Sequence, residues 1–124
     1  MSLYEQLPVY KSALDLAVYF EKIVSNFERS HKFTIGADLK NLSRRILVLV
    51  AKANTKQSRK ECLVEVLDKL EELKIIIHLC KEIKAFRSLN SFEFATKSVI
   101  EVSKQCEGWL RSQNFSGVKL EEAS

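Results

Sequence analysis

Glycine and proline are scarce in this sequence of 124 residues, which contains three glycines and one proline. Tight turns and hairpins depend on these two residues, so the chain has few places for them. Long helices joined by short connections suit such a composition. Because 46% of the residues are hydrophobic, the chain is apolar enough and long enough to bury the core of one domain.

Cysteine is too rare and too widely spaced to build a stapled fold or a metal centre. Cys62, Cys80 and Cys106 form no C-x-x-C motif and no ligand spacing with His31 or His78. An odd number of cysteines also argues against a closed disulfide framework. We therefore expect three small, buried hydrophobic residues on helix faces, with no metal and no cofactor.

Motifs of catalysis and of membrane insertion are missing as well. The sequence has no phosphate-cradling glycine loop, no H-E-x-x-H and no G-x-S-x-G. His78 lies in an apolar stretch without a partner for a general base, so we expect it to be packed, hydrogen-bonded or in an interface. The longest apolar run, residues 46–51, is far shorter than the roughly 18 residues of a membrane span, and the N-terminus lacks the apolar segment of a secretory signal. These absences predict a cytoplasmic protein that is not an enzyme.

What the sequence does contain is a helical period, because apolar residues recur at spacings of three and four in four segments. Thr34 is the expected N-cap of the second helix, Ser58 with Glu61 forms a capping box for the third, and Asn90 is the expected N-cap of the fourth. Gly108 near the end of the last helix is expected to permit close approach of a neighbouring backbone. The predicted helices cover about residues 8–28, 35–53, 59–86 and 91–112.

The connections between these helices are short, so consecutive helices are expected to run antiparallel. The prediction is an all-α protein, an antiparallel up-down-up-down four-helix bundle that forms a single domain over residues 1–113. Residues 114–124 are polar and keep no lasting period, and we expect a frayed C-terminal tail. The run Ile75 to Ile77 is apolar nearly all round its helix, which favours placing part of it in the core and part in a subunit interface.

Acidic residues are absent from one stretch, residues 40–60, which contains seven basic residues. The remainder of the chain contains thirteen basic and sixteen acidic residues, so the formal charge of +4 divides into +7 here and −3 elsewhere. The first five of the seven fall within about 160° of one another on a helical wheel, opposite the apolar residues. The candidate nucleic-acid-binding residues are Lys40, Arg44, Arg45, Lys52, Lys56, Arg59 and Lys60.

Two readings suit this cationic face. Lysine and arginine side chains that contact phosphates release counterions, which gives salt-dependent binding to RNA or DNA with little sequence specificity. No aromatic residue alternates with the basic residues, so base stacking is not expected. Alternatively, acids on adjacent helices or on a neighbouring protomer neutralise the face, and the protein is a structural oligomer.

Several short motifs, taken in their order and spacing, resemble the accessory variability determinant family, whose members accompany the reverse transcriptase of diversity-generating retroelements. The likeness covers about residues 9–112. The motifs are Phe33-Thr-Ile-Gly36, Leu39-Lys-Asn-Leu42, Ala53-Asn54, Leu70-Glu-Glu-Leu-Lys74, Lys81-Glu-Ile-Lys84 and Gly108-Trp109-Leu110.

The resemblance implies a homopentamer of four-helix protomers whose basic surface binds nucleic acid and the partner reverse transcriptase. Such proteins assist mutagenic copying of a template RNA into complementary DNA and have no catalytic activity of their own. His78 stands where the family often has arginine, and Glu107 stands where it often has glycine.

A second resemblance, to the 23S ribosomal RNA intervening-sequence proteins, also implies four helices. Those proteins have an Arg-Arg pair in the second helix, matched here by Arg44 and Arg45. The proline and the Glu-Gly ending that follow the pair in that group are missing from this chain. Under this alternative the protein is a structural oligomer without a reverse transcriptase partner.

Overall fold

The computed structural model describes residues 3–123, and it describes side chains over residues 4–113. It contains no strand within these residues, which confirms the all-α class. A short 3-10 helix, η1 (Leu3–Gln6), precedes α1, and a second, η2 (Lys56–Ser58), joins α3 to α4. A one-turn helix, α2 (Arg29–Lys32), joins α1 to α3. The four long helices are α1 (Pro8–Ser25), α3 (Ile35–Lys52), α4 (Arg59–Glu82) and α5 (Leu89–Ala123).

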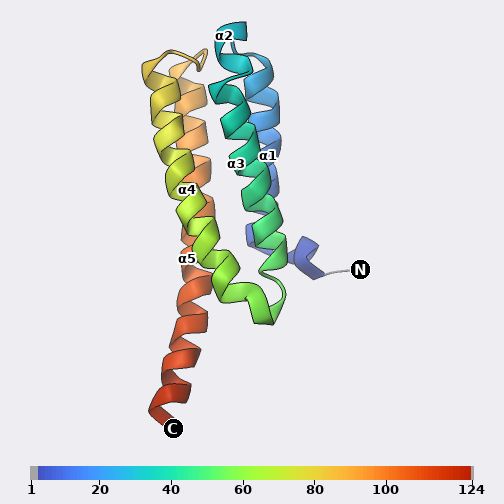
Figure 1. Cartoon of the computed structure of the whole chain (residues 1–124), viewed down its shortest axis with the longest axis vertical. Helices are drawn as coiled ribbons and strands as arrows, with labels where there is room; N and C mark the ends of the chain where they lie inside the picture. The colour runs from blue at the N-terminus through green and yellow to red at the C-terminus, as the bar shows by residue number, and fades with distance from the viewer. Residues whose placement is uncertain (1–2, 124) are drawn as a thin grey trace.

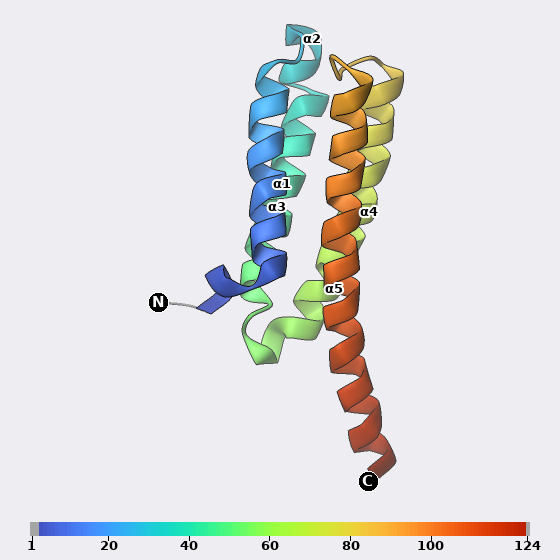
Figure 2. The same cartoon turned by 180° about the vertical axis from the view of Figure 1, so that it is seen from behind.

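The long helices lie side by side, with their connections at the ends (Figures 1 and 2). Each packs on two neighbours: α1 on α3, α3 on α4, α4 on α5, and α5 on α1. Every helix contributes an apolar stripe to the shared core, and Phe20, Leu39, Leu70 and Val99 are among its fully buried residues. The apolar residues that recur with the helical period in the sequence are therefore the ones that form the core.

The junction between α1 and α3 depends on a glycine. The first predicted helix extends to residue 28, but α1 ends at Ser25, and α2 forms where the sequence predicted a plain connection. A Cβ atom at Gly36 would lie 2.7 Å from Cγ1 of Val24 and 3.0 Å from the carbonyl oxygen of His31. Only a residue without a side chain lets the start of α3 lie this close to the end of α1.

Thr34 and Ser58 occupy the N-cap positions of α3 and α4 as predicted, but neither side chain caps its helix. Thr34 Oγ1 donates to the carbonyl oxygen of Ser30 at 2.9 Å, and Ser58 Oγ donates to that of Lys52 at 3.2 Å. Neither residue has the extended backbone that directs an N-cap oxygen toward the next turn. The prediction that these two side chains form capping hydrogen bonds is therefore wrong.

The cap of α5 is Ser88 rather than Asn90. Ser88 Oγ accepts a hydrogen bond from the backbone N–H of Ser91 at 3.1 Å. Because α5 already begins at Leu89, Asn90 lies inside the first turn, and the prediction that Asn90 caps the helix is wrong.

Helix α4 ends four residues before the predicted boundary at residue 86. Lys84 adopts a positive φ of 61°, and the N–H of Ala85 donates to the carbonyl oxygen of Cys80 at 2.8 Å. A left-handed residue followed by this hydrogen bond is how many helices end. The chain then turns inward, and Phe86 is buried.

The C-terminal part of α5 extends beyond the other three helices (Figure 1). Its backbone is helical as far as Ala123, so α5 is longer than the predicted helix over residues 91–112. The side chains after residue 113, and residue 124 altogether, lie outside the described part of the chain. The frayed tail over residues 114–124 therefore stays a prediction, as does the single domain over residues 1–113.

Candidate nucleic-acid interface

The seven basic residues of the candidate site lie on three consecutive elements. Lys40, Arg44, Arg45 and Lys52 are on α3, Lys56 is in η2, and Arg59 and Lys60 are in the first turn of α4. Lys40 and Arg59 are half-buried, whereas the other five are exposed. Their partners separate six of them into three groups with different chemistry, and the seventh, Lys40, acts by its charge on Glu21, the partner of Arg44.

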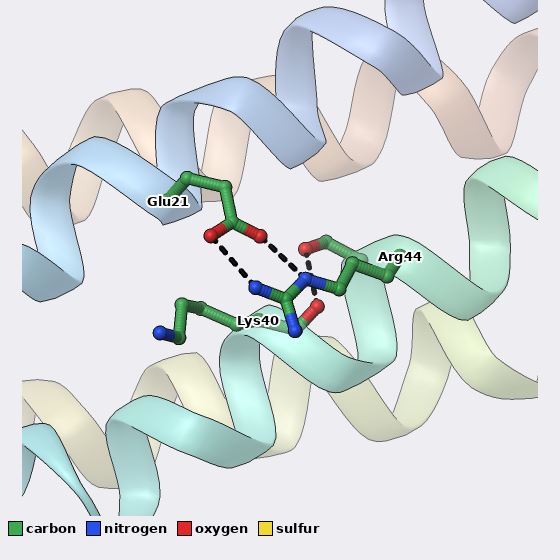
Figure 3. A network of polar contacts seen from close by, with 4 residues as sticks. Glu21, Lys40 and Arg44 are labelled. Carbon is green, nitrogen blue, oxygen red and sulfur yellow. Dashed lines mark hydrogen bonds and ion pairs between the residues drawn. The ribbon is translucent and has the colours of Figure 1, made fainter.

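Arg44 is paired with an acid on the neighbouring helix α1. Its Nε donates to Oε2 of Glu21 at 2.6 Å and its Nη2 donates to Oε1 at 2.8 Å, which makes a bidentate pair (Figure 3). The hydrogen bond from Arg44, together with the charges of Arg44 and Lys40, lowers the pKa of the Glu21 carboxyl. The charge of Arg44 is thus neutralised within the protomer.

Arg59 is engaged in holding three helices together. Its Nε donates to the carbonyl oxygen of Ala53 at 2.9 Å and its Nη2 donates to that of Asn54 at 3.0 Å. These carbonyl groups follow the last turn of α3, where a helix leaves acceptors without partners. The guanidinium group also lies 5.1 Å from the ring centre of Trp109 on α5. Such contacts give Arg59 a structural role, and its assignment as a phosphate ligand stays a prediction.

The remaining exposed cations are Arg45, Lys52, Lys56 and Lys60, which we call the open basic set. Among the side chains that the structure describes, none accepts a hydrogen bond from these four or forms an ion pair with them. Three of the four lie where α3 passes through η2 into α4, at one end of the bundled part of the helices (Figure 1). An uncompensated group of cations is suited to bind an anion with several charges.

Two aromatic residues from other elements lie beside this basic region. Tyr4 of η1 and Tyr10 of α1 contact each other, with ring centres 4.9 Å apart and ring planes inclined by 57°. The tyrosines come from η1 and α1 and meet α3 only through the fold, so the basic stretch itself, which has no aromatic residue, does not indicate them. The two rings and α3 line a shallow depression, which we call the tyrosine hollow, formed by Tyr4, Tyr10, Leu47, Val48, Ala51 and Lys52.

The outer face of α4 has a different character. Ile77 is buried in the core, whereas the side chains of Ile75, Val64 and Leu79 are 68%, 52% and 49% exposed. The apolar run of residues 75–77 is thus divided between core and surface. His78 is not packed within the protomer, because its side chain is 71% exposed, and its Nε2 lies 4.0 Å from a carboxylate oxygen of Glu82.

The cysteines lie where the sequence predicted, since Cys62, Cys80 and Cys106 are all buried. Burial raises the pKa of the Cys80 and Cys106 thiols to about 12, so both are protonated near neutral pH and are poor nucleophiles. Over the described residues, no three side chains of histidine, cysteine, aspartate or glutamate gather as metal ligands would. None of the helices in that part of the chain has the length and apolar content to cross a bilayer.

The fold and the open basic set define a small helical protein with a cationic end. A comparison with protein-family models matches residues 9–113 to the bAvd-like family. The chain belongs to this family, which confirms the resemblance to accessory variability determinants. No curated protein and no solved structure matches the chain.

Proposed function

We propose that this protein is a non-catalytic accessory subunit of a diversity-generating retroelement. In this role it binds RNA or DNA, docks the partner reverse transcriptase in the cytoplasm, and supports mutagenic synthesis of complementary DNA. Membership of the bAvd-like family supports the proposal. The observation that carries the nucleic-acid part is the open basic set, four exposed cations without acidic partners among the described side chains.

The expected chemistry is contact between cations and phosphates. Each lysine or arginine that meets a phosphate of a single strand contributes about 0.7 to the slope of log affinity against log salt concentration. Because Arg44 and Arg59 already have partners, we assign the contacts mainly to Arg45, Lys52, Lys56 and Lys60, with Lys40 as a further candidate on α3.

Charge reversal tests this assignment. In Arg45→Glu with Lys52→Glu, we expect affinity for labelled single-stranded RNA, measured by fluorescence anisotropy, to fall at least tenfold and the salt slope to fall by about 1.4. The matched control is Lys97→Glu with Lys104→Glu, which makes the same charge change on exposed positions of α5. Absence of binding at low salt, or an equal loss in the control, would refute the proposed site.

The proposed fold behind this function is an antiparallel up-down-up-down bundle. Two hydrogen bonds support opposite directions for α1 and α5: Tyr19 Oη donates to the carbonyl oxygen of Ser91, and Gln105 Nε2 donates to Oγ of Ser12. Advancing along α1 from residue 12 to residue 19 therefore corresponds to moving back along α5 from residue 105 to residue 91. Short connections and contacts between consecutive helices support the same arrangement for the other pairs.

We further propose that the protein assembles with copies of itself, as a pentamer by family likeness, through the outer face of α4. Exposed apolar side chains that share one helix face are typical of interaction surfaces. Ile75→Glu with Leu79→Glu should reduce the particle mass in sedimentation analysis. The control, Leu14→Glu with Val18→Glu, makes the same change on exposed positions of α1. An unchanged mass in the α4 variant would place the interface elsewhere.

Docking of the reverse transcriptase is tested by co-expression with the polymerase encoded in the same retroelement. We expect the two proteins to co-purify and the complex to survive nuclease treatment. Loss of the complex on nuclease treatment would mean that nucleic acid, rather than protein contact, joins them.

A second candidate function is the structural oligomer without a polymerase partner, as in the intervening-sequence proteins. The observation that favours it is the acidic surface of α4, which could neutralise the open basic set of another copy. In that case, assembly dissociates as salt rises, and Arg45→Glu with Lys52→Glu lowers the particle mass instead of the RNA affinity. The exposed acids are Glu61, Glu65, Asp68, Glu71, Glu72 and Glu82.

A further inference from the structure

The tyrosine hollow combines aromatic, apolar and basic residues. It has a volume of about 370 Å³. Tyr4 and Tyr10, which touch each other, line it together with the half-buried Leu47 and Ala51 and the exposed Lys52. Figures 1 and 2 both show η1 beside the end of α3 that leads into η2, so the hollow and most of the open basic set lie near the same end of α3.

The geometry of the two rings leaves aromatic surface accessible. Their planes are inclined by 57°, so they form a corner rather than a closed stack. Both tyrosines are half-buried, and the neighbouring Val48 is 44% exposed. An apolar corner of this kind is suited to a flat ring that lies on one tyrosine and meets the other with its edge.

The surrounding charge restricts which flat ring is suitable. Lys52 belongs both to the hollow and to the open basic set, so an occupant that carries negative charge beside an aromatic group matches both features. A nucleotide has this combination, with a base for the aromatic corner and a phosphate for the lysine. The base must be unpaired, because in a duplex both of its faces are stacked on neighbouring bases.

We propose that the tyrosine hollow receives one base of a single-stranded nucleic acid, stacked on Tyr4 or Tyr10, while Lys52 contacts an adjacent phosphate. This inference rests on the proposed nucleic-acid binding and specifies its strand type. It predicts that the protein prefers a single strand with bases over a bare sugar-phosphate backbone of equal charge. It also predicts a preference for a single strand over a duplex of the same sequence.

The test uses Tyr4→Leu with Tyr10→Leu, which keeps an apolar wall against α1 and α3 and removes both aromatic rings. Affinity for an oligodeoxyadenosine should fall roughly tenfold, as expected for loss of one base stack. Affinity for the abasic oligomer of equal length, and the salt slope, should stay unchanged. The matched control is Phe94→Leu, an exposed aromatic residue on α5, which should affect neither probe.

Ultraviolet cross-linking gives a second readout that needs no variant. With the unmodified protein and the same oligodeoxyadenosine, the cross-linked peptide should contain Tyr4 or Tyr10. A cross-link only to other peptides would overturn the inference. An equal loss of affinity for both probes in the tyrosine variant would also overturn it, as would an unchanged affinity for the base-bearing probe.

Two further outcomes separate this inference from the function on which it rests. If Arg45→Glu with Lys52→Glu weakens binding of both probes but the tyrosine variant weakens neither, only the stacking site is wrong. If the charge reversal also leaves both probes unaffected, the proposed nucleic-acid function fails with it. A lower particle mass of the tyrosine variant in sedimentation would show that a second copy covers the hollow, and would overturn the inference.

Discussion

Arg44 and Arg45 are adjacent in the sequence but differ in what surrounds them. Arg44 forms the bidentate pair with Glu21 of α1, whereas Arg45 is exposed and belongs to the open basic set. A helix turns by about 100° per residue, so the two neighbouring arginines point in different directions, and only Arg44 reaches Glu21 of α1. The charge count of a segment is therefore only an upper limit on the number of cations that a ligand can use.

This difference predicts opposite effects of two alanine substitutions. Arg45→Ala should lower RNA affinity and reduce the salt slope by about 0.7, with an unchanged melting temperature. Arg44→Ala should leave the slope unchanged and slightly lower the melting temperature, because Glu21 loses its partner. Fluorescence anisotropy and thermal melting of both variants check the prediction. Equal salt slopes for the two variants would contradict the different roles of Arg44 and Arg45.

Gly36 and Gly108 provide a second matched pair. An added methyl group at Gly36 would collide with Val24 and the carbonyl group of His31, so Gly36→Ala should destabilise the protein by about 1–3 kcal/mol. A Cβ atom at Gly108 would have its nearest neighbour at 3.9 Å, in the side chain of Arg111, so the prediction that a backbone approaches closely there is wrong. Gly108→Ala should stabilise the helix by up to about 1 kcal/mol. Urea unfolding measures both, and the same sign for both variants would contradict this account.

The buried thiols predict a dependence of stability on alkaline pH. Burial raises the pKa of Cys80 and Cys106 to about 12 in the folded state, against about 8.5 in an unfolded chain. A raised folded pKa favours folding below about pH 8.5, and this contribution is lost as pH rises toward 12. At about pH 8, a thiol reagent should react slowly with both residues in the folded protein and rapidly in denaturant. Equal rates would contradict their burial.

At the scale of the elements, the end of α4 contains a residue in an unfavourable conformation. Lys84 has a φ of 61°, which costs a residue with a side chain roughly 1–2 kcal/mol relative to glycine. Lys84→Gly should therefore raise the free energy of unfolding by about 1 kcal/mol. The control, Lys69→Gly inside α4, should lower it by a similar amount, and urea unfolding distinguishes the two.

The helices and the starts of α1, α3 and α4 could be predicted from the sequence, but the ends of α1 and α4 and the cap of α5 could not. Buried positions such as Leu39, Ile46 and Leu70 recur with the helical period, so many residues together report each helix. A helix end depends on one or two residues instead. Ser88 and Asn90 are both good caps, and only the fold decides between them. The end of α4 has a lysine where a glycine would have indicated a left-handed residue.

At the scale of the whole molecule, the two proposed surfaces should differ in their response to salt. Phosphate contacts weaken as salt rises, whereas apolar contacts through Ile75 and Leu79 do not depend on charge pairing. Sedimentation with labelled RNA should therefore show free RNA and an intact oligomer at about 0.5 M salt. Dissociation of the oligomer under these conditions would favour the charge-paired structural oligomer.

The candidate site could be predicted only in part from the sequence, because the partners of its cations lie far away along the chain. The cations are close together along the chain, so their number was evident. Whether each has a partner depends on residues far away, such as Glu21 for Arg44 and Trp109 for Arg59. The tyrosine hollow joins Tyr10 to Lys52 across two helices, and no local pattern relates them.

The contact between Arg59 and Trp109 also has an optical consequence. Trp109 is the single tryptophan of the chain, so all indole emission comes from the corner where α3, α4 and α5 meet. A charged group at 5.1 Å from the ring affects the energy of its excited state, so any displacement of Arg59 shifts the emission spectrum. The unlabelled protein thus contains its own fluorescent reporter, in contact with Arg59, which directly precedes Lys60 of the open basic set.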